Sequence, residues 1–198
     1  MLLYDSQVSG NCYKVRLLLA HLGLAYDRHE VDVIQRQGRA ELLGDLNPAL
    51  RVPTLVLDDG RALAESNAIL WYLAEAGPLL PGDHFERAKA LQWLFFEQYS
   101  HEPNIAVVRF WVAVLKAPPP EAEIAPKRTA GYAALTAMER HLSTRRYLVN
   151  ERFTIADIAL YAYTHVASEG GFDLGSYSAI GSWLERVALT PGHVTMTD

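Results

Sequence analysis

The chain has 198 residues and a formal net charge of −5, with 50% hydrophobic and 21% charged residues. This composition is typical of a folded globular protein, and the length permits one large domain or two small ones. Lysines and arginines are scattered rather than gathered in a stripe, which argues against nucleic acid as a partner. The apolar runs are far shorter than a membrane span and the N-terminus lacks the pattern of a signal peptide, so we expect a cytoplasmic protein with no membrane partner.

The cysteine and histidine content argues against a metal site. A single cysteine excludes a disulfide within the chain and a zinc site built from clustered cysteines. The seven histidines show no spacing typical of metal ligands. We therefore expect no metal.

Strand and helix patterns alternate along the first 77 residues. The expected elements are a strand at 2–4, a helix after Ser9 that ends at Gly23, a strand around Val31 and Val33, an irregular helix within 34–47 with Leu42, Leu43 and Leu46 inward, a strand at 53–57, its hairpin partner at 61–64, and a helix capped by Ser66. The predicted order is βαβαββα.

Residues 78–83 are rich in proline, glycine and leucine, as a linker would be, and only helical patterns follow them. The expected helices are a long one over 85–115 with a kink at Pro103, one through Tyr132 and Leu142, one that begins with a capping box at Thr154 and Asp157, and one between Tyr177 and Val187. The sequence thus predicts an α/β domain followed by an all-α domain.

The tetrapeptide Ser9-Gly10-Asn11-Cys12 closes the first strand and opens the first helix. Free N–H groups at a helix start carry partial positive charge and favour an anion such as a thiolate. The Ser9 hydroxyl could add a hydrogen bond, although it could also simply cap the helix. Cys12 has no second cysteine beside it, so we interpret it as a small buried hydrophobic residue.

Four segments resemble, in their order and spacing, the cytosolic glutathione transferase family: 9–15, 51–55, 65–69 and 153–157. The resemblance covers essentially the whole chain. It implies a thioredoxin-like glutathione-binding domain at residues 1–77, a linker at 78–83, and an all-helical domain at 84–198 that contributes the electrophile pocket.

The same resemblance implies glutathione as co-substrate and assigns residues to hold it. The Val52–Pro53 bond would be cis, which turns the Val52 backbone toward the cysteinyl amide of glutathione. Glu65 and Ser66 would hold the γ-glutamyl end, and Arg51 would meet the glycyl carboxylate. From the residues alone, a trans proline, an N-capping serine, and a solvated glutamate and arginine remain open. Gln35, Arg36 or Gln37 could add a contact to glutathione from the loop above the site.

Two residues are candidates for activating the glutathione sulfur. Ser9 coincides with the catalytic serine of theta, delta and zeta-like members, whose hydroxyl donates to the sulfur. Asn11 is a rival donor, because some bacterial and fungal relatives place an asparagine near the sulfur. The Ser-Ser-Cys of zeta members is here Ser9-Gly10-Asn11, which argues against a zeta-type isomerase.

We therefore predict a glutathione transferase that conjugates glutathione to a small hydrophobic electrophile, with peroxide reduction as an extension. The alternatives are a glutathione-dependent disulfide reductase and a non-catalytic binding module. The resemblance also implies a homodimer that pairs the sheet domain of one subunit with the helical domain of the other. Candidate aromatic residues near that seam are Trp71, Tyr72, Trp93 and Phe96, and side chains that could wall the electrophile pocket are Tyr99, His101, Arg109, Phe110 and Trp111.

Overall fold

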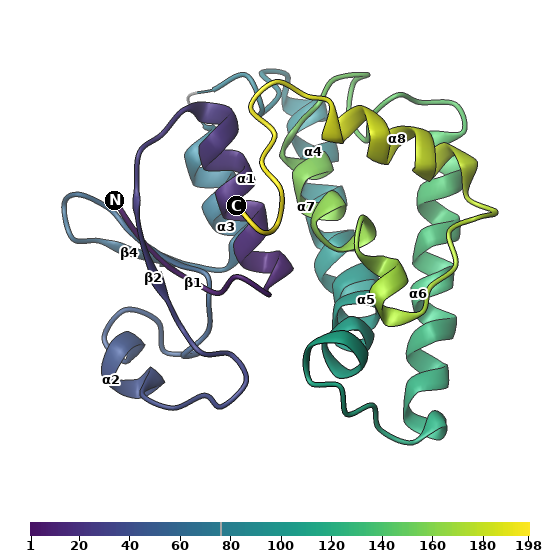
Figure 1. Ribbon diagram of the computed structural model, residues 1–198. Coiled ribbons are helices and arrows are strands. Elements are labelled where there is room, and N and C mark those ends of the chain that lie inside the picture. The colour runs from purple at the N-terminus through teal and green to yellow at the C-terminus, as the bar shows by residue number, and fades with distance from the viewer. Residues whose placement is uncertain (76) are drawn as a thin grey trace. The chain divides into compact units, whose positions relative to one another are not determined.

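The computed structural model describes residues 1–75 and 77–198, and the chain divides into an α/β unit and a helical unit (Figure 1). Met1–Gly77 together with Pro191–Asp198 form the first unit, and Pro78–Thr190 form the second. The α/β plus all-α fold class is the one that the sequence predicts.

The first unit holds a four-stranded mixed sheet. Its elements are β1 (Leu2–Asp5), α1 (Gly10–Leu22), β2 (Asp27–Glu30), α2 (Arg39–Leu43), β3 (Thr54–Val56), β4 (Ala62–Ala64) and α3 (Ser66–Ala74). The strand order is β2-β1-β3-β4, with β1 parallel to β2 and antiparallel to β3, and β3 antiparallel to β4. The predicted βαβαββα order is confirmed.

The second strand lies earlier than the sequence predicts. The pattern places it around Val31 and Val33, whereas β2 covers the polar Asp27–Glu30 and pairs Leu2 with Asp27. All four residues of β2 are exposed, because β2 is the edge of the sheet and lacks apolar alternation. Val31 follows the strand and is buried, and its N–H donates to the Asp5 carbonyl at 2.8 Å.

The segment between β2 and β3 is also less regular than expected. Its only α-helix is the five-residue α2. Of the three leucines that the sequence predicts to face inward, Leu43 is fully buried, while Leu42 and Leu46 are half-buried. A helix this short places only one side chain fully in the core.

The core of the α/β unit joins α1 and α3 to the sheet. Side chains from β1, α1, β3 and α3 form one buried cluster, namely Leu3, Val15, Leu19, Leu55 and Ile69. Ser9 caps α1, since its side chain accepts from the Cys12 N–H, and Gly23 ends the helix at φ 63°. A left-handed residue at this position is best supplied by glycine. Both predicted ends of α1 are therefore confirmed.

The C-terminal segment Pro191–Asp198 packs with the α/β unit, whereas the sequence places it in the helical domain. The Tyr13 hydroxyl donates to the Val194 carbonyl at 2.8 Å, and Arg16 Nη2 donates to the Met196 carbonyl at 2.7 Å. Tyr13 and Arg16 are buried, so they need acceptors, and the tail backbone supplies them. Figure 1 shows the C-terminus beside α1.

The helical unit consists of α4 (His84–Phe96), a π-helical turn (Glu97–His101), α5 (Glu102–Arg109), a second π-helical turn (Phe110–Val114), α6 (Glu121–Leu142), α7 (Ile155–Thr164), a 3-10 turn (Ala167–Gly170) and α8 (Ser178–Ala188). The predicted long helix over 85–115 is thus interrupted by π-helical turns. Pro103 is the second residue of α5, directly after the first such turn, because proline cannot donate a helical N–H bond. None of the helices among the described residues is long and apolar enough to cross a membrane.

The predicted capping box at the start of α7 is present and does more than cap. Asp157 Oδ2 accepts from the Thr154 N–H and hydroxyl, while Oδ1 accepts from the Leu148 N–H at 3.0 Å and from Trp183 Nε1 at 2.9 Å. Burial raises the pKa of Asp157 to about 6, although these hydrogen bonds oppose the rise. One buried carboxylate therefore ties α7 to the preceding loop and to α8.

We predict that Asp157→Ala lowers the free energy of unfolding by about 3 kcal/mol or more, because each buried donor left without an acceptor costs about 1 to 3 kcal/mol. The measurement is chemical denaturation. Asp83→Ala is the matched control, since Asp83 is an exposed N-cap that accepts from Phe85 and Glu86 N–H groups and should cost about 0.5 to 2 kcal/mol. Equal losses in the two variants would mean that Asp157 acts only as a cap.

Candidate functional site

The N-termini of α1 and α3 meet at one end of the α/β unit. Asn11, the second residue of α1, and Ser66, the first residue of α3, approach within 3.3 Å between Asn11 Oδ1 and Ser66 Oγ. The partial positive charges of two helix starts add at this place. The meeting point therefore favours an anionic ligand.

Ser9 lies directly before this meeting point. Its Oγ accepts from the Cys12 N–H at 3.3 Å, and its own N–H donates to the Ser6 carbonyl at 3.0 Å. The capping bond uses a lone pair of the oxygen and leaves the hydroxyl proton available to a ligand. The capping and the sulfur-binding interpretations of Ser9 are thus compatible.

Lys14 belongs to the same group, although the sequence analysis did not select it. Its side chain is fully buried, and its Nζ donates to Asn11 Oδ1 at 2.8 Å and to Ser66 Oγ at 3.3 Å. The available signal was a lysine three residues after Asn11, which places both side chains on the same face of the helix. The structure thus brings Asn11, Lys14 and Ser66 into one hydrogen-bonded triangle.

The start of α3 lies one residue earlier than the sequence predicts, with Glu65 rather than Ser66 at the N-cap. Ser66 is the first residue of α3 and is buried, while Glu65 is in the N-cap position, is exposed, and makes no side-chain capping bond. Glu65 also has φ 67° and ψ 113°, a backbone conformation that costs a non-glycine residue about 1 to 3 kcal/mol. The predicted N-capping role of Ser66 is therefore wrong, and its hydroxyl faces Asn11 and Lys14 instead.

The loop before β3 carries the remaining predicted residues. The Val52–Pro53 peptide bond is cis, as expected. The Arg51 carbonyl accepts from Asn47 Nδ2 and from Thr54 Oγ1, both at 2.9 Å, while the Arg51 side chain is exposed. The loop backbone is thus fixed from both sides, and the guanidinium is free to reach solvent.

Arg39 is a second residue that the sequence analysis missed. Its Nη1 donates to the Leu50 carbonyl at 3.3 Å, and its Nε and Nη2 donate to the Asp32 carbonyl. Desolvation lowers the pKa of Arg39, and so do the positive charges of Arg36 and Arg51, while Asp32 raises it. The positive charges of Arg36 and Arg51 therefore act on Arg39 near this loop.

Cys12 is unsuited to redox chemistry. It is fully buried, and desolvation, followed by the negative charge of Asp5, raises the pKa of its thiol well above the usual range. A thiol that stays protonated at neutral pH is a poor nucleophile. This agrees with the interpretation of Cys12 as a small hydrophobic residue.

Two of the polar residues considered for the electrophile pocket have structural partners. His101 is buried and its Nε2 lies 2.9 Å from Thr164 Oγ1, and Arg109 Nε donates to Glu169 at 2.7 Å. Tyr99 is 87% exposed. The structure thus gives His101 and Arg109 roles within the helical unit.

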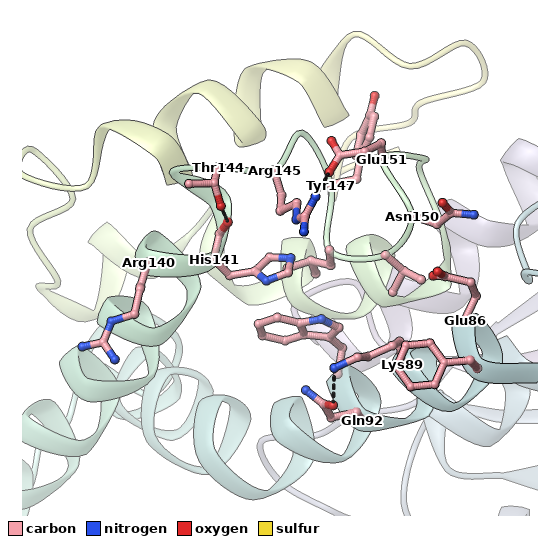
Figure 2. Close-up of a pocket in the computed structure, with 14 residues that line it drawn as sticks. Glu86, Lys89, Gln92, Arg140, His141, Thr144, Arg145, Tyr147, Asn150 and Glu151 are labelled. Atoms are coloured by element: carbon pink, nitrogen blue, oxygen red, sulfur yellow. Dashed lines mark hydrogen bonds and ion pairs between the residues drawn. The ribbon is translucent and has the colours of Figure 1, made fainter.

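A cavity of about 550 Å³ lies within the helical unit, between α4, the end of α6 and the loop before α7 (Figure 2). Its lining includes Phe85, Lys89, Trp93, His141, Tyr147 and Glu151. The His141 and Trp93 rings meet edge to face, with 4.9 Å between their centroids, and burial lowers the pKa of His141. Because this cavity holds none of the predicted site residues, we place the candidate site in the α/β unit.

The residues that the structure describes contain no group of three or more histidine, cysteine, aspartate or glutamate side chains that could hold a metal ion. The ligand groups that the site suits are therefore inferred from its serine, asparagine, lysine and arginine side chains. These groups are hydrogen-bond donors and cations, which suit carboxylates and thiolates.

Comparison with known proteins gives the family. The model of the glutathione S-transferase N-terminal domain matches residues 8–76, and that of the C-terminal domain matches residues 93–191. A solved glutathione S-transferase from Pseudomonas fluorescens is 48% identical, with a TM-score of 0.95, and the match covers 100% of this chain and 98% of that one.

Two curated relatives carry different activities in their names. The disulfide-bond oxidoreductase YfcG of Escherichia coli is 30% identical over 91% of this chain and 87% of its own length. A probable maleylacetoacetate isomerase of Caenorhabditis elegans is 28% identical over 97% of this chain and 90% of its own length. Together with the two domain matches and the fold, these similarities show that the chain belongs to the cytosolic glutathione S-transferase family.

Proposed function

We propose that this chain is a glutathione S-transferase that activates the glutathione thiol for conjugation to a small hydrophobic electrophile. Membership of the family supports a glutathione-dependent activity in general. The observation that carries the finer proposal is the meeting of two helix starts, where Asn11 and Ser66 are 3.3 Å apart and Ser9 caps the first helix. Such a place favours both an anionic sulfur and a carboxylate.

The residues around this point suit the parts of glutathione. Ser66 would donate its hydroxyl to the γ-glutamyl carboxylate, and the exposed Glu65 would take the ammonium group of the same end. The Val52 backbone, before the cis bond to Pro53, would pair with the cysteinyl amide. Arg51, with Arg39 nearby, would attract the glycyl carboxylate.

Thiol activation in this proposal comes from two donors, Ser9 and Asn11. A free thiol has a pKa of about 8.5, and each unit by which it falls requires about 1.4 kcal/mol of extra stabilisation of the thiolate. One charge-assisted hydrogen bond is sufficient for such a change. The thiolate would then attack the electrophile directly, without a covalent step on the protein.

A glutathione-dependent disulfide reductase is the second candidate. Asn11 is part of the hydrogen-bonded triangle at the site, and the relative from Escherichia coli is named a disulfide-bond oxidoreductase. Because Cys12 is buried, the reacting thiol would have to be that of glutathione in this case too. Activity toward chlorodinitrobenzene, cumene hydroperoxide and hydroxyethyl disulfide separates conjugation, peroxide reduction and disulfide reduction. A chain that binds no glutathione would instead be a non-catalytic module.

Ser66→Ala should weaken glutathione binding by about 1 to 3 kcal/mol, because a hydrogen bond to a charged group is lost. Isothermal titration calorimetry measures this change, and thermal melting checks that the variant is folded. Ser178→Ala is the matched control, since Ser178 is the first residue of α8 and is exposed. Unchanged affinity in a folded Ser66→Ala protein would refute the placement of the γ-glutamyl end.

Ser9→Ala and Asn11→Ala should each raise the thiol pKa of bound glutathione by about one unit while glutathione still binds, since the helix starts remain. Titration of the ultraviolet absorbance of the thiolate measures this shift. Cys12→Ala is the control and should leave the pKa unchanged. A shift in Asn11→Ala alone would assign thiolate stabilisation to Asn11 and favour the disulfide reductase. If no variant shifted the pKa, only backbone N–H groups would remain as the source of thiolate stabilisation.

We also propose that the protein forms a homodimer through the exposed side of α4. Leu91 and Phe95 on α4 and Tyr99 in the following turn recur every four residues, and Phe95 is 68% exposed. Trp93 and Phe96 are two of the aromatic residues that the sequence suggests for the seam. Trp93 is buried and packs against Phe96 within the helical unit, with 5.2 Å between the ring centroids. An exposed apolar stripe of this kind is typical of an interface.

Phe95→Glu should convert the dimer into a monomer, because a charge would be buried at the apolar contact. Analytical ultracentrifugation at micromolar concentration measures the change. Leu189→Glu is the matched control, since Leu189 is 83% exposed but lies outside the stripe on α4. A wild-type protein that sediments as a monomer would contradict the proposal.

A further inference from the structure

We propose that Lys14 is a positioning residue that orients the Asn11 side-chain amide and links it to the carboxylate site at Ser66. Its buried ammonium would hold the Asn11 oxygen inward and so present the Asn11 Nδ2 to the glutathione sulfur. This inference rests on the proposed function, since it concerns the same site.

The contacts of Lys14 determine which way the amide faces. Lys14 Nζ is 2.8 Å from Asn11 Oδ1, and an ammonium only donates hydrogen bonds. The branch of the amide that faces Lys14 must therefore be the oxygen. The Nδ2 branch then points away from Lys14, as a donor to a ligand requires.

The Ser66 hydroxyl connects this orientation to the carboxylate site. Its Oγ accepts from Lys14 Nζ at 3.3 Å, and its single proton is directed to Asn11 Oδ1, also at 3.3 Å. A bound carboxylate would compete for that proton and would win, because hydrogen bonds to charged acceptors are stronger. Lys14 would then be the donor that keeps the Asn11 oxygen in place while substrate is bound.

Packing alone does not account for a lysine here. Lys14 is fully buried. Burying an ammonium is costly unless hydrogen bonds compensate for the lost water. The charge is thus retained at a position where it makes two specific hydrogen bonds to site residues.

The rival explanation is a direct electrostatic effect of the Lys14 charge on the thiolate. The two explanations differ in one respect. A positioning residue acts through Asn11, so its effect disappears when Asn11 lacks an amide, whereas a direct charge effect persists.

The test is a double-mutant cycle on the thiol pKa of bound glutathione, measured by thiolate absorbance. Lys14→Met should raise this pKa by about one unit, a tenfold change in the ionisation constant, and should cause no further shift when Asn11→Ala is already present. Arginine, like lysine, donates hydrogen bonds but accepts none. The thiol pKa in Lys14→Arg should therefore rise by no more than half of the rise seen in Lys14→Met. Calorimetric affinity for glutathione is measured alongside.

Two results would overturn the inference: a folded Lys14→Met protein with an unchanged thiol pKa, or the same shift in the Asn11→Ala background. Absence of glutathione binding or of thiolate absorbance in the wild-type protein would instead refute the proposed function. A crystal structure of the wild-type protein with glutathione tests the inference even if Lys14→Met does not fold. The sulfur should lie on the amide branch opposite Lys14, and a sulfur on the same branch would contradict the inference.

Discussion

The packing of α1 and α3 against the sheet is the constraint on which the candidate site depends. One small apolar cluster, which joins Leu3 of β1, Val15 of α1 and Ile69 of α3, fixes the two helices in the α/β unit. Their N-termini therefore meet, and Asn11 and Ser66 come within hydrogen-bond distance. The apolar core thus brings together two helix starts, whose partial positive charges favour an anion.

Buried charges in the α/β unit are used to join segments that are distant in sequence. Asp5 accepts two hydrogen bonds from Arg16 at 2.9 Å and forms an ion pair with Arg28 at 2.6 Å. Arg16 also donates a hydrogen bond to the Met196 carbonyl, so the C-terminal segment is attached to α1, the helix that Ser9 caps. Lys14 follows the same principle, since its ammonium joins α1 to α3. Asp5, Arg16 and Lys14 are buried, and hydrogen bonds compensate for much of the water that their charges lose.

In the helical unit, a buried carboxylate likewise joins segments that are distant in sequence. Asp157 gathers donors from the loop before α7, from the start of α7 and from Trp183 of α8. The sequence predicts the local part of this arrangement, because a capping box is a short-range pattern between Thr154 and Asp157. The contacts to Leu148 and Trp183 depend on where chain folding brings those residues.

The sequence by itself determined the element order, the cap at Ser9, the end of α1 at Gly23 and the family, because these features are set by short patterns and their spacing. Only the tertiary structure decided that β2 is a polar edge strand, that Ser66 is inside α3 rather than capping it, and that residues 191–198 join the α/β unit. It also decided that Lys14 contacts Asn11 and Ser66. The physical reason is range: propensity and capping act over a few residues, whereas burial and the choice of hydrogen-bond partner are settled between segments that only the fold brings together.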